Sequence, residues 1–217
     1  GLAFVHPLLA LIPVLALFSG AAALRQIRHY WPTYIGRWAA LLGLWLAILV
    51  LVAVPTRWFV WHVMVEDEAI RFGDQFMQLV ANGKPIEAHQ LSLPINLRLP
   101  TDDSMLEIYR SDPARIEGVR SFAADRPIRT LLALGERADV RLYEVESVVT
   151  NGASAAVSLL YAITFDDQGT RRTFFERLIL VRENRPDDAR SGWKVHQVAG
   201  DVLPRAMSTS AEQQDRP

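Results

Sequence analysis

Four side chains have the chemistry of acid–base catalysis: Asp74, Tyr143, Tyr161 and Glu176. An isomerase-type site needs a carboxylate that accepts a proton and acidic donors, often a tyrosine, that stabilise an oxyanion. Tyr143, Tyr161 and Glu176 alternate with apolar residues in segments of strand-like sequence, so we expect all three to face the core. The pattern therefore defines a candidate catalytic set.

The same residues also have a purely structural interpretation. A buried tyrosine commonly packs its ring and hydrogen-bonds its hydroxyl. Glu176 could form an ion pair with Arg172 or Arg141 across a strand ladder. The sequence leaves both interpretations open and favours the structural one, that is, a protein that is not an enzyme.

Other kinds of chemistry lack the residues they need. His62, His89 and His196 are scattered without the spacing of metal ligands, so we expect no metal site. No phosphate-binding glycine loop, dinucleotide fingerprint or Gly-x-Ser-x-Gly motif occurs, and we expect no cofactor. The chain contains no cysteine, which excludes disulfides and thiolate chemistry.

Charge is divided unevenly along the chain. All 24 acids lie from Glu66 onward, whereas only Arg25, Arg28, Arg37 and Arg57 of the 23 basic residues precede them. The remaining 19 basic residues give the C-terminal part a net charge of −5. A basic face is expected of a nucleic-acid-binding protein, so we expect no nucleic acid as a partner.

The elements that position the candidate set begin with two apolar runs. Residues 2–24 are 23 positions without a charge, and residues 38–54 are 17 more, closed by Pro55. A helix needs about 20 apolar residues to span the hydrocarbon core, so we predict a two-helix transmembrane hairpin over residues 1–61. A cleaved signal peptide is the alternative interpretation of the first run.

The loop at residues 25–37 sets the predicted topology. Its arginines favour the cytoplasmic side, which predicts an inner-membrane protein with an extracytoplasmic C-terminal domain. Tryptophans beside arginines are typical of the headgroup region. The predicted membrane-interface residues are Arg25, Arg28, Trp31, Arg37, Trp38, Arg57, Trp58 and Trp61.

The runs ALRQI (23–27) and IGRWAALLG (35–43) resemble a small two-helix bacterial membrane domain of unknown function. In that family a Gly-Arg pair opens the second helix, and Gly36 and Arg37 occupy those positions here. The resemblance covers roughly residues 5–54 and implies a membrane anchor without an assigned activity.

After residue 61 the patterns predict an α+β domain over residues 62–207 and a disordered tail over 208–217. Helices come first, and then four antiparallel strands joined by turns form a meander on which the helices pack. The predicted helices cover 66–82, 85–91, 113–122 and 126–135. The predicted strands cover 140–150, 154–165, 171–183 and 192–200.

This element order, an Ala-x-Gln-Leu-type second helix and a last strand that begins GWKV (192–195) resemble the cone-shaped nuclear transport factor 2-like superfamily. That superfamily includes ketosteroid isomerase-like and polyketide cyclase-like (SnoaL-like) enzymes and also non-catalytic modules, among them membrane-anchored assembly subunits of secretion machines. The resemblance spans roughly residues 66–203 and implies a pocket at the open end of the sheet.

The sequence therefore predicts a membrane-anchored extracytoplasmic binding or assembly module. Its expected partners are the membrane, a second copy or a partner membrane protein, and a small apolar ligand. One alternative is an isomerase, cyclase or dehydratase whose pocket is lined by Tyr143, Tyr161 and Glu176. Another is a subunit of a membrane transport or secretion complex that uses Gly43 and Trp45 as a contact face.

Overall fold

A computed structural model describes residues 37–100, 103–152, 154–183 and 192–204, together with Phe18 and Arg25. The chain divides into two compact units, Gly1–Val63 and Met64–Pro217. The first predicted membrane span, most of the predicted cytoplasmic loop and the predicted C-terminal tail lie outside the described residues.

Helix α2 (Arg37–Ala81) corrects the predicted boundary at Pro55, because the helix continues through this proline. A proline inside a helix removes one backbone hydrogen bond and crowds the preceding turn. Next to it, the Thr56 hydroxyl donates to the Val52 carbonyl oxygen at 2.8 Å. The helix predicted to begin at Glu66 is therefore the C-terminal part of α2.

Within the part of the chain that the structure describes, one helix has the length and composition to cross a membrane, the stretch Leu41–Ala81 of α2. Its first half exposes large apolar side chains, among them Trp45 at 70% and Leu49 at 62%. The described residues thus contain one long apolar helix where we predicted a hairpin.

The remaining helices follow α2 in short succession. They are α3 (Pro85–Ser92), η3 (Ile95–Leu97), α4 (Asp103–Ser111), α5 (Pro113–Ala124), α6 (Arg126–Leu134) and η4 (Gly135–Arg137). Asp112 caps α5 as predicted, since its Oδ1 accepts from the Ala114 N–H at 3.0 Å. Helix α6 ends at Leu134, close to the predicted end, and is capped by Gly135, whose φ of 57° suits glycine. Helix α4 had no counterpart in the prediction.

Four strands form one antiparallel sheet in the order β1-β2-β3-β4, which confirms the predicted meander. They are β1 (Asp139–Asn151), β2 (Ser154–Asp167), β3 (Thr170–Glu183) and β4 (Gly192–Ala199). The β2–β3 turn has positive φ at Gln168 (55°) and Gly169 (84°), the geometry of a tight two-residue hairpin. Strand β1 carries two bulges, between Leu142 and Glu144 and between Val145 and Ser147.

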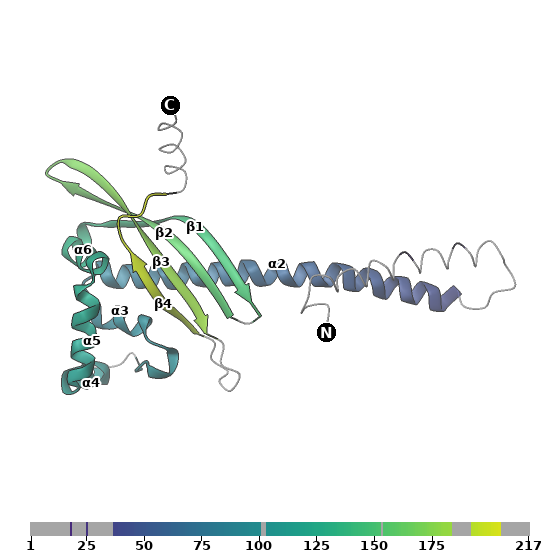
Figure 1. Cartoon of the computed structure of the whole chain (residues 1–217), viewed down its shortest axis with the longest axis horizontal. Coiled ribbons are helices and arrows are strands. Elements are labelled where there is room, and N and C mark those ends of the chain that lie inside the picture. Colours follow the sequence, from purple (N-terminus) through teal and green to yellow (C-terminus); the bar gives the residue numbers. More distant parts are fainter. Residues whose placement is uncertain are drawn as a thin grey trace, which may run out of the picture. The chain divides into compact units, whose positions relative to one another are not determined.

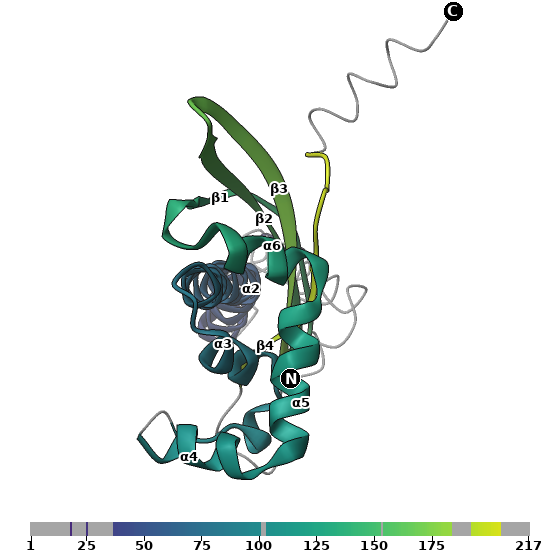
Figure 2. The same ribbon diagram turned by 90° about the vertical axis from the view of Figure 1, so that its left-hand side faces the viewer.

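The C-terminal part of α2 and one face of the sheet share the core, while α4, α5 and α6 follow one another at one end (Figures 1 and 2). Gly73 permits the close approach of α2, because a Cβ there would lie 2.6 Å from the Tyr161 hydroxyl and 2.7 Å from Leu159 Cδ1. The fully buried side chains of this core include Val65, Phe76, Met77, Val80, Val157, Leu159, Tyr161, Ile163, Leu178 and Leu180.

Candidate ligand-binding site

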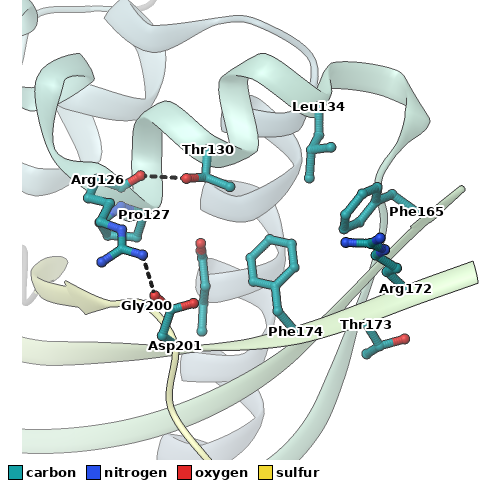
Figure 3. Close-up of a pocket in the computed structure, with 11 residues that line it drawn as sticks. Arg126, Pro127, Thr130, Leu134, Phe165, Arg172, Thr173, Phe174, Gly200 and Asp201 are labelled. Carbon is teal, nitrogen blue, oxygen red and sulfur yellow. Dashed lines mark hydrogen bonds and ion pairs between the residues drawn. The ribbon is translucent and has the colours of Figure 1, made fainter. Parts of the chain in front are cut away.

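A cavity of about 370 Å³ lies between α6, the turn-proximal halves of β2 and β3, and the residues that follow β4 (Figure 3). Its apolar walls are Pro127, Leu134, Phe165 and Phe174. The polar residues that line it are Arg126, Thr130, Arg172, Thr173, Glu176 and Asp201.

Helix α6 forms one wall because its two faces differ. Ile128 and Leu131 are fully buried and fix the helix on the core. Thr130 and Leu134 then line the cavity opposite Phe174 of β3, as Figure 3 shows. Close packing after β4 completes the wall, since a Cβ on Gly200 would lie 3.4 Å from Pro127 Cβ.

Glu176 occupies the core face of β3, as predicted from its alternation with Leu178 and Leu180. Its side chain is only 1% exposed, and neither carboxyl oxygen has a hydrogen-bond partner among the described residues. Buried polar groups are almost always hydrogen-bonded, so a lone one at a cavity wall calls for an explanation.

The ion pairs considered for Glu176 do not form. Arg172 binds Asp167 at 3.0 Å, and Arg141 binds Asp139 at 3.0 Å. Both arginines therefore pair with acids close to them in sequence. Ion pairing across the ladder is the wrong account of Glu176.

The surroundings of Glu176 favour its neutral form. Burial raises the pKa of the Glu176 carboxyl, and the nearby charges of Asp201 and Asp125 raise it further, to about 8. Arg126 is also close to this cavity, but it binds Asp201 at 2.8 Å (Figure 3). At neutral pH Glu176 is thus mostly a carboxylic acid, which can donate one hydrogen bond and accept others.

The structure brings Tyr161 and Asp74 together as a hydrogen-bonded pair. The Tyr161 hydroxyl donates to Asp74 Oδ1 at 2.8 Å, and the Tyr161 side chain is 1% exposed. Burial, followed by the bond to Asp74, raises the pKa of Tyr161 above its ordinary value, so it remains a neutral donor. The pair borders a different hollow, of about 240 Å³, with Met77, Gln78 and Arg141.

Tyr143 lies on the other face of the sheet, which corrects the prediction that it faces the core. It is 47% exposed, and its ring meets Phe175 edge-on at a centroid distance of 5.1 Å. The first bulge in β1 explains the error, because Leu142 pairs with Tyr161 and Glu144 with Leu160, leaving Tyr143 as the extra residue. The three residues predicted to line one pocket do not converge.

The sequence interpretation missed most of the cavity wall. Phe174 could have been identified, because it stands two residues before Glu176 on the same strand face. Thr130, Leu134 and Asp201 come from segments distant in sequence, and no local pattern brings them together.

The structure describes six of the eight predicted membrane-interface residues. Trp38, Arg57, Trp58 and Trp61 lie on α2, where Trp58 stacks on His62 at 5.3 Å between ring centroids. Arg25 is exposed and Arg37 begins α2, while Arg28 and Trp31 lie outside the described residues.

No protein-family model matches this sequence, and no curated protein matches it. The chain is similar to a solved NTF2-like protein with a cystatin-like fold from Novosphingobium aromaticivorans, at 14% identity and a TM-score of 0.42. That match covers 75% of this chain and 95% of the other. A second similar structure, from Xanthomonas campestris, is named a calcium/calmodulin dependent protein kinase II association domain. It has 17% identity and a TM-score of 0.32, over 64% of this chain and 87% of the other.

The architecture is α+β, with helices packed on a four-strand antiparallel meander. It has the element order that the nuclear transport factor 2-like resemblance implied.

Proposed function

We propose that this protein is a membrane-tethered binding module whose α+β domain binds a small, largely apolar ligand in the cavity beside α6. The observation that carries the proposal is Glu176, a buried carboxyl at the cavity wall without a hydrogen-bond partner among the described residues. A bound ligand with one polar group would supply that partner.

The size and lining of the cavity support the same proposal. Ligand pockets usually enclose about 300–1,000 Å³, with mostly apolar walls and a few polar groups that orient the ligand. This cavity measures about 370 Å³ and presents Leu134, Phe165 and Phe174 beside the Glu176 carboxyl. It suits a ligand with a compact ring or a short chain.

The tether is the apolar first half of α2. Exposed side chains such as Trp38, Trp45 and Leu49 suit a lipid environment better than water. Arg25 and Arg37 at the N-terminal side favour a cytoplasmic start, which would leave the α+β domain on the extracytoplasmic side.

A fragment screen against the full chain in detergent tests the binding proposal, with ligand-observed NMR as the readout. Small apolar fragments should bind the wild type and lose binding to Thr130→Phe, which fills the cavity from an exposed position of α6. Arg129→Phe places the same ring on the neighbouring exposed residue and should leave binding unchanged. Equal binding to both variants would place the fragments elsewhere and defeat the proposal.

Membrane fractionation and cysteine labelling test the tether. Leu46→Arg combined with Leu49→Arg should release the protein from membranes, since both side chains are more than half exposed on α2. The chain has no cysteine, so Glu136→Cys creates a unique label site on the α+β domain. An impermeant maleimide should label it in intact cells. Labelling only after lysis would contradict the proposed topology.

An enzyme of the isomerase, cyclase or dehydratase type is the second candidate function. Its support is the pKa of Glu176, raised by burial to about 8, which suits proton transfer near neutral pH. Turnover of apolar carbonyl substrates that Glu176→Gln abolishes would favour it. Binding without turnover would favour the binding module.

A further inference from the structure

The buried and the exposed parts of the cavity carry different charged groups. At the buried part lies Glu176. Burial raises the pKa of its carboxyl, and the charges of Asp201 and Asp125 raise it further. The cations that line the cavity are Arg126 and Arg172, whose side chains are 78% and 63% exposed and bind Asp201 and Asp167. Glu176 is therefore the acidic group at the buried end of the cavity, and the two arginines are paired with acids at its solvent edge.

We propose that the ligand of this cavity is an organic cation, a protonated amine on a compact apolar body, whose ammonium group binds the Glu176 carboxylate. The inference rests on the proposed function, because it names the ligand class of the same cavity. An ammonium would supply hydrogen-bond donors to the carboxyl oxygens that have no partner among the described residues.

The apolar walls fit the remainder of such a molecule. Phe165 and Phe174 line the cavity and meet edge to face, with 6.0 Å between ring centroids. Aromatic faces attract cations and pack well on rings, so the two phenylalanines suit an aromatic or cyclic amine. An anionic ligand would instead bring a negative charge beside the Glu176 carboxyl, while the arginines that line the cavity already bind Asp201 and Asp167.

Binding in this form displaces a proton. The neutral Glu176 acid releases its proton to the buffer, and the resulting carboxylate forms an ion pair with the ammonium, so charge and atoms balance. The groups that face Glu176 are Asp125 and Arg126 at the start of α6, Tyr161 of β2 (bonded to Asp74 of α2), Arg172 of β3 and Asp201 after β4. Of these, the two flanking acids oppose ionisation of Glu176 until a cation arrives.

Titration calorimetry with the full chain in detergent tests the inference. The probes are benzylamine, cyclohexylmethylamine and hexylamine, each beside its matched alcohol. At least one amine should bind about tenfold more tightly than its alcohol near pH 8. Below that pH its affinity should fall, and buffers of different ionisation enthalpy should report the release of nearly one proton.

Two variants locate the effect. Glu176→Gln should remove the preference for amine over alcohol and the proton release, while Glu107→Gln, at an exposed position of α4, should change neither. Should Glu176→Gln fail to fold, the proton release of the wild type alone still decides.

The outcomes separate the two proposals. Alcohols that bind as tightly as amines, in competition with Thr130→Phe-sensitive fragments, would refute the organic cation and leave the binding module standing. Amines that bind without proton release would also refute it. Failure of every amine, alcohol and fragment to bind would refute both proposals.

Discussion

Tyr161 and Glu176 stand directly opposite each other in the β2–β3 ladder, and both side chains are 1% exposed. The two side chains differ in their hydrogen bonds. The Tyr161 hydroxyl binds Asp74 of α2, whereas the Glu176 carboxyl has no such partner among the described residues. One residue of this pair thus holds α2 on the sheet, and the other is the group to which we propose a ligand binds.

Removal of the Tyr161 hydroxyl should destabilise the domain. Tyr161→Phe keeps the buried ring but leaves a carboxyl oxygen of Asp74 without this donor, at a cost of about 1–2 kcal/mol in the free energy of unfolding. Urea unfolding measures the cost, with Tyr143→Phe on the half-exposed outer face as the control. In a double-mutant cycle with Asp74→Ala the losses should not add. Additive losses would show that the two side chains act independently.

Glu176 should make stability fall as pH rises. Its pKa in the folded state is raised to about 8 from an ordinary 4.5, so over this interval the folded state holds a proton that the unfolded state releases. Relative to Glu176→Gln, the wild type should therefore lose about 2–4 kcal/mol between pH 5 and pH 8, and little further once the folded-state carboxyl has ionised.

Urea unfolding of both proteins at a series of pH values checks this difference. Glu107→Gln, an exposed site, should run parallel to the wild type at every pH. If the stability of Glu176→Gln also ran parallel to that of the wild type, the Glu176 carboxyl would be ionised in the folded state at every pH. Its pKa would then not be raised.

Replacement of Gly73 by alanine should destabilise the protein, contrary to the usual effect of this change inside a helix. Alanine in a helix interior is normally more stable than glycine by about 0.5–1 kcal/mol. At Gly73 the added methyl would collide with Tyr161 and Leu159, so we expect a net loss of about 1–3 kcal/mol.

Gly43→Ala is the matched control for this substitution, since it lies on the same helix with nothing within 4 Å of the added atom. Thermal unfolding in detergent compares the two variants. A gain in stability from Gly73→Ala would mean that α2 and the sheet are not in close contact at this residue.

Replacement of Arg177 by lysine should lower the free energy of unfolding. Its Nε and Nη2 donate to the two carboxyl oxygens of Glu146 at 2.5 and 2.7 Å, and Ser158 donates to the same carboxyl at 2.8 Å. The Glu146 side chain is only 4% exposed. Lysine cannot form the two-pronged contact, so Arg177→Lys should cost about 1–2 kcal/mol, and Arg177→Met about 3 kcal/mol.

Urea unfolding at neutral pH measures these costs. Arg172→Lys, whose side chain is 63% exposed beside Asp167, should change stability by less than about 0.5 kcal/mol. A similarly small effect at Arg177 would show that the buried contact contributes little.

Local sequence determined most of the elements. The Asp112-Pro113 start, the Gly135 stop and the strand alternation from residue 140 onward predicted helices and strands that the structure confirms. Each signal acts within a few residues through capping, φ preference or side-chain alternation, so neighbours in sequence suffice to specify it. The same short range explains why the alternation placed Glu176 on the buried face correctly.

Tertiary packing decided the rest. The bulge at Tyr143 shifts β1 by one residue, a change that simple alternation cannot show. Nearby acids bind Arg141 and Arg172, so neither of these arginines pairs with Glu176, and α6 and Asp201 meet beside it from distant segments. A cavity exists only where such segments converge, and the burial that raises the pKa of Glu176 exists only once they have packed.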